Sequence, residues 1–123
     1  MANWKLSVGD FCHVHVPAGD SERAGRFYAS VFGWELSEYS GTPYVEIKTS
    51  EDGIRGVIGP GVFGERDITA WILVDDVDAA LARVEQHGGK ALHAHPEVPP
   101  DFGDFGLASD PDGLVFGLWK KPS

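Results

Sequence analysis

The chain has 123 residues, of which 42% are hydrophobic and 24% charged, and a formal net charge of −9. Length and composition indicate one globular domain, and the acidic balance argues against partners that need a basic face, namely nucleic acid and anionic membrane surfaces. Its one cysteine excludes an intrachain disulfide, and neither a leader nor a membrane-spanning run is apparent, so we expect a soluble, cytoplasmic protein.

The first half of the chain predicts one helix among four short strands. The segment 11–16 is apolar apart from two histidines and is typical of a strand. A helix is expected to start at Asp20 or Ser21, whose side chains can cap its first turn, and to stop at Gly33. Alternating or short apolar segments, separated by turns rich in Gly and Pro, predict further strands over 34–39, 44–49 and 54–58.

The second half predicts the same order of elements. An apolar strand over 69–74 precedes Asp75 and Asp76, which are expected to cap a second helix that Gly88 and Gly89 end. Three more strands are expected to complete this half, over 90–95, 104–109 and 114–120.

The two halves form an internal repeat. Asp20, Ala24 and Gly33 align at one constant offset with Asp76, Ala80 and Gly89. A half of this size cannot easily bury both its sheet face and its helix alone, so we expect the halves to pack together. The predicted fold class is therefore α+β, with two tandem βαβββ modules, about 8–61 and 66–121, in a single domain spanning 1–123.

Several local patterns stand in the order of a known family. They are His13–Val16 followed by Asp20–Ala24, then Val31–Glu35, Val74–Ala80, and Asp110–Gly113 before Phe116–Leu118. Together they resemble the vicinal oxygen chelate superfamily, in particular an uncharacterised bacterial branch of it. That superfamily includes glyoxalase I, extradiol dioxygenases, fosfomycin-resistance enzymes and bleomycin-resistance proteins. The resemblance implies two modules that pair their mixed sheets around a cleft, and a homodimer.

Chelating members of the superfamily hold a divalent metal with a His or Gln that opens each module and a Glu on each module's last strand. Carried onto this chain, those positions fall on His13, Thr69, Gly117 and, in the first module, 56–57. His13 is a suitable ligand, but the threonine is a poor one and the Gly and Val positions offer none. His15, on the same strand face as His13, adds at most one nitrogen. The resemblance therefore implies neither the standard metal site nor another cofactor.

Six residues are candidates for a ligand cleft. Two strand histidines facing one side can bind a ligand or exchange protons, a carboxylate can act as a base or hold a cation, and three aromatic rings can line an apolar pocket for a planar ligand. Hydrogen-bonded strand histidines, a solvated sheet face and core packing are the structural alternatives. The candidates are His13, His15, Tyr44, Glu46, Trp71 and Phe105.

Three other features stand out, and two of them have two interpretations. Cys12 alternates with His13 and is expected to be a small core residue. His93 and His95 either form a metal-binding pair or mark an exposed strand end. The aromatic, Gly-flanked segment Phe102–Gly106 forms either a lid over the cleft or an ordinary connection.

These observations favour a protein that binds a small molecule in the cleft between modules or subunits without the standard metal. The net charge of −9 would suit a cationic ligand. The alternative is a divalent-metal-dependent lyase, isomerase or dioxygenase that uses a degenerate site at His13 with His15 or Glu46. A third possibility is a structural or regulatory protein with no ligand, which a cleft filled by side chains would favour.

Overall fold

The structure is a computed structural model that describes residues 6–123. Residues 1–5, which form part of the segment expected to carry no leader, lie outside the described residues. The first half forms β1 (Phe11–Pro17), α1 (Ser21–Phe32), β2 (Glu35–Glu38), β3 (Val45–Lys48) and β4 (Arg55–Gly59). The second half forms β5 (Thr69–Leu73), α2 (Val77–Gln86), β6 (Lys90–Ala94), the short 3-10 helix η1 (Pro100–Phe102), β7 (Asp104–Ser109) and β8 (Val115–Lys120).

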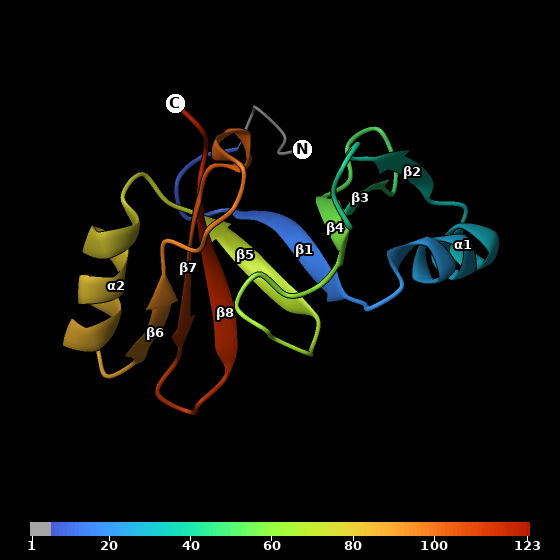
Figure 1. The fold of residues 1–123 in the computed structure, drawn as a ribbon. Coiled ribbons are helices and arrows are strands. Elements are labelled where there is room, and N and C mark those ends of the chain that lie inside the picture. Colours follow the sequence, from blue (N-terminus) through green and yellow to red (C-terminus); the bar gives the residue numbers. More distant parts are fainter. Residues whose placement is uncertain (1–5) are drawn as a thin grey trace.

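All eight strands join in one sheet, in the order β2-β3-β4-β1-β5-β8-β7-β6 (Figure 1). Within each half the first strand lies parallel to the last, β1 beside β4 and β5 beside β8. The two halves meet where β1 runs antiparallel to β5 at the centre of the sheet. The predicted α+β class and the repeated strand, helix and three strands are confirmed.

Matching caps explain why the two helices begin at equivalent places. The Asp20 carboxylate accepts a hydrogen bond from the Arg23 amide at 3.0 Å, and Asp76 accepts one from Ala79 at 2.9 Å. Each bond satisfies an amide that has no partner inside the first turn. α1 ends at Gly33, whose φ of 74° lies in the left-handed region that favours glycine.

Three clusters of buried residues form the core. One lies under each helix, and the third lies on the opposite face of the sheet. The cluster under α1 is built from Val16, Val45, Ile47 and Ile58. The cluster under α2 is built from Val74, Val77, Ala80, Leu81, Ala108 and Leu118. The third cluster takes the alternate strand positions and joins both modules, with Cys12, Trp71, Leu73, Phe102, Phe105 and Trp119.

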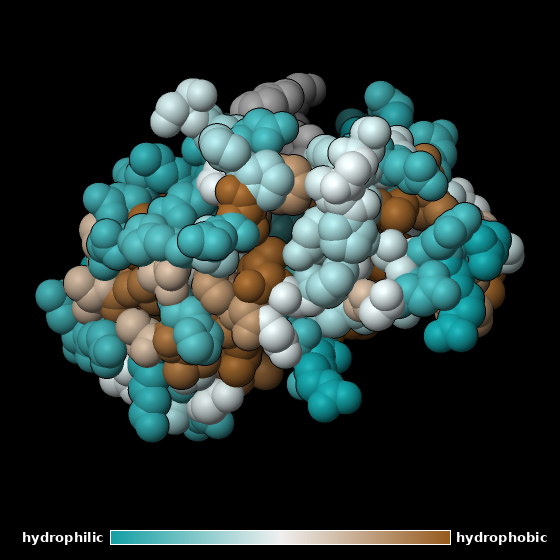
Figure 2. Space-filling view, viewed as in Figure 1, coloured by the Kyte–Doolittle hydropathy of each residue, from teal (hydrophilic) through white to brown (hydrophobic). Residues whose placement is uncertain are grey.

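The face shown in Figure 2 is mostly hydrophilic, in keeping with the net charge of −9. An apolar area interrupts it near the middle of that view, over the strands of the second module. A groove of about 430 Å³ follows the connector between the modules, where Ile68, Leu114 and Val115 are exposed. Among the described residues, no helix is long and apolar enough to cross a membrane.

Candidate functional site

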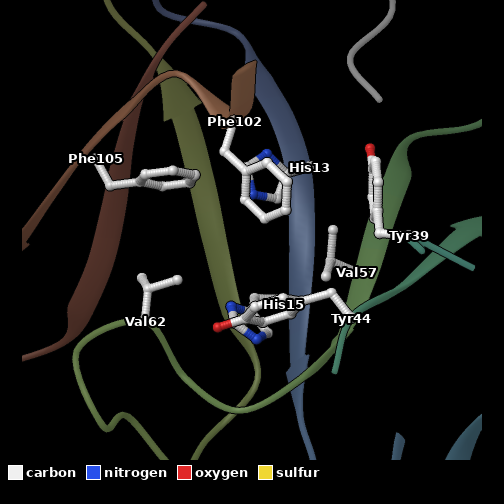
Figure 3. Close-up of a pocket in the computed structure, with 8 residues that line it drawn as sticks. All are labelled: His13, His15, Tyr39, Tyr44, Val57, Val62, Phe102 and Phe105. Atoms are coloured by element: carbon white, nitrogen blue, oxygen red, sulfur yellow. The ribbon is translucent and has the colours of Figure 1, made fainter. Parts of the chain in front are cut away.

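A small pocket lies between the modules, on the face of the sheet opposite α2. Its enclosed volume is about 20 Å³, room for roughly one water molecule, and about 340 Å³ lies between its walls out to the solvent. The lining side chains come from both halves of the chain (Figure 3): His13, His15, Tyr39, Tyr44, Val57, Val62, Phe102 and Phe105.

The floor of the pocket is formed by the central strand and its neighbour. His13 and His15 project from β1, and Val57 projects from β4, where it pairs with His15. Residues two apart on a strand face the same side, so both histidines reach the pocket. Phe105 from β7 closes the far wall, and Val62 enters from the connector between the modules.

His13 is a neutral imidazole. Its side chain is almost fully buried, with 3% of its surface exposed, and burial lowers its pKa to about 3. The ring stacks on Trp71 with centroids 5.4 Å apart and 8° between the planes, and meets the edge of Trp119 at 5.8 Å. At neutral pH His13 can therefore donate a hydrogen bond to a ligand or accept one, but it brings no positive charge into the pocket.

His15 is held by a backbone carbonyl. Its Nε2 lies 3.1 Å from the oxygen of Gly59, and because a carbonyl oxygen only accepts, Nε2 must carry a proton. The ring also meets Tyr44 edge-on, with centroids 6.2 Å apart. His15 is thus oriented from two sides, and only its other nitrogen is left to meet a ligand.

The turn between β2 and β3 positions two tyrosines at the mouth of the pocket. Thr42 connects them, because its hydroxyl donates to the Tyr39 carbonyl at 2.9 Å and accepts from the Tyr44 amide at 3.2 Å. The Tyr39 hydroxyl donates to the Glu46 carboxylate at 2.8 Å. Burial is the main cause that raises the pKa of Tyr39, and its bond to Glu46 adds to the effect.

Phe102 closes the mouth from the opposite module. Its ring centroid lies 5.3 Å from that of Tyr39 and 6.0 Å from that of Tyr44. The Trp119 indole nitrogen donates to the Phe102 carbonyl at 2.8 Å, and the next residue, Gly103, has a φ of 87°. The bond from Trp119 therefore holds the backbone under the Phe102 ring in place.

The residues at the family's chelating positions do not fit a divalent metal. Trp71 pairs with His13 on one side and with Gly117 on the other. A Cβ added at Gly117 would collide with the Cδ2 and Cε3 atoms of the Trp71 indole. The indole thus fills the space into which a carboxylate at 117 would project. On the remaining positions, Val57 is apolar and the Thr69 hydroxyl donates to the carbonyl of Asp67 at 3.0 Å.

The second pair of histidines does not converge on a common site. His93 stacks on Phe63, with centroids 5.4 Å apart, whereas His95 lies between Asp78 and Asp104. Within residues 6–123, no group of three or more His, Cys, Asp or Glu side chains could hold a metal ion.

The structure brings four of the six predicted candidates into the pocket: His13, His15, Tyr44 and Phe105. Glu46 stands behind Tyr39 and Trp71 stacks on His13, and neither lines the pocket. Sequence reasoning placed Phe102 only in a possible lid and Val57 only at an unsuitable ligand position, and it missed Tyr39 and Val62. Tyr39 ends an alternating segment just before a turn, which is a usable signal, whereas Val62 lies in an irregular connector with no periodic pattern.

Comparison with known proteins gives a consistent family. The model of the Glyoxalase/Bleomycin resistance protein/Dioxygenase superfamily matches residues 11–118. A glyoxylase-like domain-containing protein from Didymella fabae is 29% identical, over 93% of this chain and 95% of its own length.

Two solved structures share the fold at low sequence identity. One is described as an NAD-dependent benzaldehyde dehydrogenase from Legionella pneumophila, with a TM-score of 0.66, 16% identity and coverage of 89% of this chain and 97% of its own. The other is a methylmalonyl-CoA epimerase, with a TM-score of 0.63, 19% identity and coverage of 96% and 99%. At these identities the likeness establishes the fold alone.

Proposed function

Because the chain belongs to the Glyoxalase/Bleomycin resistance protein/Dioxygenase superfamily, we propose that it binds a small organic molecule in the pocket between its modules without a divalent metal. The fold hosts several activities, so the proposal depends on the site. The observation that carries it is the indole of Trp71, which stacks on His13 and covers Gly117.

The donor set explains why the proposal excludes metal-dependent chemistry. A catalytic divalent site needs about three protein ligands around an open position. Here His13 has no second ligand at the matching positions, because Trp71 and Val57 present carbon atoms where donors would stand. The alternative of a degenerate site at His13 with His15 or Glu46 is disfavoured. The Glu46 carboxylate is engaged by Tyr39, and two histidines alone fall short of three ligands.

The pocket offers contacts suited to an organic ligand. Its walls are mainly aromatic and aliphatic, and they gain free energy when a ligand replaces water against them. Polar contacts come from the two histidines, His13 and His15, and from the Tyr44 hydroxyl. Because the enclosed volume is only about 20 Å³, a ligand larger than a water molecule must turn the Phe102 ring aside.

Ligand screening with a blocked pocket tests the proposal. A panel of small aromatic, aliphatic and amine compounds is screened by thermal shift in EDTA, and positive compounds are titrated by calorimetry. Val62→Trp fills the pocket from the connector between the modules, and Val31→Trp is the matched control, since Val31 is 56% exposed on α1. We expect a compound that stabilises the natural protein and Val31→Trp but not Val62→Trp. Binding that needs an added divalent metal, equal binding to Val62→Trp, or no binding across the panel would contradict the proposal.

A further inference from the structure

We propose that the mouth of the pocket recognises a methylated ammonium group, so that the ligand is an organic cation. This inference rests on the proposed function and names the chemical class that the same site takes. It is carried by three aromatic rings that converge at the mouth and by the carboxylates around them. The rings belong to Tyr39, Tyr44 and Phe102, and we call them the mouth rings (Figure 3).

Phe102 lies against both of the other mouth rings and is inclined to each. Phe102 is tilted by 47° to Tyr39 and by 74° to Tyr44, so the three faces are not parallel and can surround one group. The face of an aromatic ring carries partial negative charge and attracts a cation within about 6 Å of its centroid. In the structure the rings touch one another, and a bound cation would part them within the 340 Å³ between the walls and solvent.

Carboxylates strengthen the negative potential at these rings. Glu46 accepts the hydrogen bond of the Tyr39 hydroxyl at 2.8 Å, which pushes electron density into that ring. Besides burial, the charges of Glu46 and Asp101 raise the pKa of Tyr39, and the charge of Glu65 raises the pKa of Tyr44. Carboxylates from both modules and from the connector therefore lie close to the two tyrosines.

Glu65, on the connector between the modules, has one carboxylate oxygen that is left without a partner in the described part of the chain. One carboxylate oxygen, Oε1, accepts from the Phe63 amide at 2.9 Å. The other, Oε2, is buried and has no hydrogen-bond partner among the described residues. A buried carboxylate oxygen without a partner lowers stability. Glu65 is close enough to Tyr44 for its charge to raise the pKa of that tyrosine, so a positive charge bound against Tyr44 would partly offset the penalty.

The mouth of the pocket favours a methylated over a primary ammonium. The surfaces that meet at the mouth are the carbon faces of the three mouth rings, and the Tyr39 hydroxyl is held at Glu46, so the mouth offers mainly carbon surface to a bound group. A primary ammonium would lose most of its hydrogen bonds to water against these carbon faces, whereas a methylated one has fewer to lose and places its methyl groups on the rings. An anion is disfavoured, because the lining contains no Lys or Arg and His13 is neutral.

Choline and 3,3-dimethylbutan-1-ol test the inference, since they share a shape and differ in charge. Titration calorimetry in EDTA compares both compounds on the natural protein, on Glu65→Gln, and on Glu38→Gln as a matched control. Glu38 is an exposed carboxylate on β2. Tyr39→Phe keeps the ring and removes the bond to Glu46, which provides a second variant if Glu65→Gln does not fold.

We expect choline to bind about tenfold tighter than the neutral alcohol. Glu65→Gln and Tyr39→Phe should reduce that ratio severalfold, and Glu38→Gln should leave it unchanged. Equal affinity for the two compounds, or an unchanged ratio in both pocket variants, would overturn the inference. Binding of neutral panel compounds without choline would also overturn it while leaving the proposed function in place, whereas no binding by any compound would overturn both.

Discussion

At the scale of single residues, Trp71 supports His13 in the floor of the pocket and fills the space beside Gly117. Its indole is fully buried, lies against Gly117 on β8 and stacks on His13 on β1. A large ring at this position supports the core formed by both modules, and it also removes the room for a second metal ligand. The glycine at 117 is required by packing, because its φ is ordinary and only its missing side chain matters.

We predict that Gly117→Ala destabilises the protein by about 1–3 kcal/mol, the usual effect of overpacking a core. In a Trp71→Ala background the same substitution should have a much smaller effect, because the indole is the group it displaces. Urea unfolding of the single and double variants measures both values. Gly19→Ala is the control, since an added Cβ there meets no atom. Equal penalties in the two backgrounds would refute this packing argument.

Cys12 is predicted to be an inert thiol in the folded protein. Burial raises its pKa to about 12, and its Sγ donates to the Trp71 carbonyl at 3.3 Å. Since the thiolate is the reactive form, a thiol reagent at pH 8 should react with the unfolded chain and hardly at all with the native one. Absorbance of the released chromophore, with and without guanidinium, follows this reaction. Rapid, complete labelling of the native protein would be inconsistent with the buried thiol.

At the scale of elements, the loop that carries Phe102 is closed at its base by His95. The imidazole Nδ1 lies 2.8 Å from Asp104, at the far end of the loop, and Nε2 lies 2.8 Å from Asp78 on α2. A neutral imidazole has a single N–H, so both bonds together require the protonated ring. Hydrogen bonding to Asp78 and then to Asp104 accordingly raises the pKa of His95.

This link should make stability depend on pH. The pKa of His95 in the folded protein is raised above its unfolded value of about 6.5. The bonds of protonated His95 therefore stabilise the folded state fully below pH 6.5, and this stabilisation is lost as the pH rises through the folded pKa. The His95 side chain is 51% exposed, so we expect at most about 1 kcal/mol. Melting temperatures of the natural protein and His95→Gln should differ at pH 5.5 and converge at higher pH. His87→Gln, on the exposed end of α2, is the control. A difference in melting temperature between the natural protein and His95→Gln that widens as the pH rises would contradict the prediction.

The elements themselves were largely predictable from sequence, whereas parts of the pocket were not. Caps such as Asp20 and Asp76 and strand alternation are local signals, and the structure places helices and strands where those signals indicated. The helix η1 was missed because three residues give no periodicity. The stack of Trp71 on His13 and the contact of Phe102 with Tyr39 join segments far apart in the sequence, and a pattern within one segment does not specify such contacts.

At the scale of the whole molecule, the two modules share a sheet and a core. β1 and β5 are paired along the centre, and the cluster on the pocket face combines Cys12 of the first module with Trp71 and Trp119 of the second. We therefore predict one cooperative unfolding transition. Indole fluorescence and far-UV circular dichroism should give coincident urea curves. Two separated transitions would show that the modules unfold independently.

The central claim is that this member of the superfamily uses its pocket without a metal, and metal content tests it most directly. Untagged protein is incubated with Zn²⁺, Mn²⁺, Ni²⁺ or Fe²⁺, desalted and measured by inductively coupled plasma mass spectrometry, with His13→Gln in parallel. We predict far less than one equivalent of each metal, and no difference between the two proteins. One equivalent of metal bound to the natural protein and lost in His13→Gln would contradict the account.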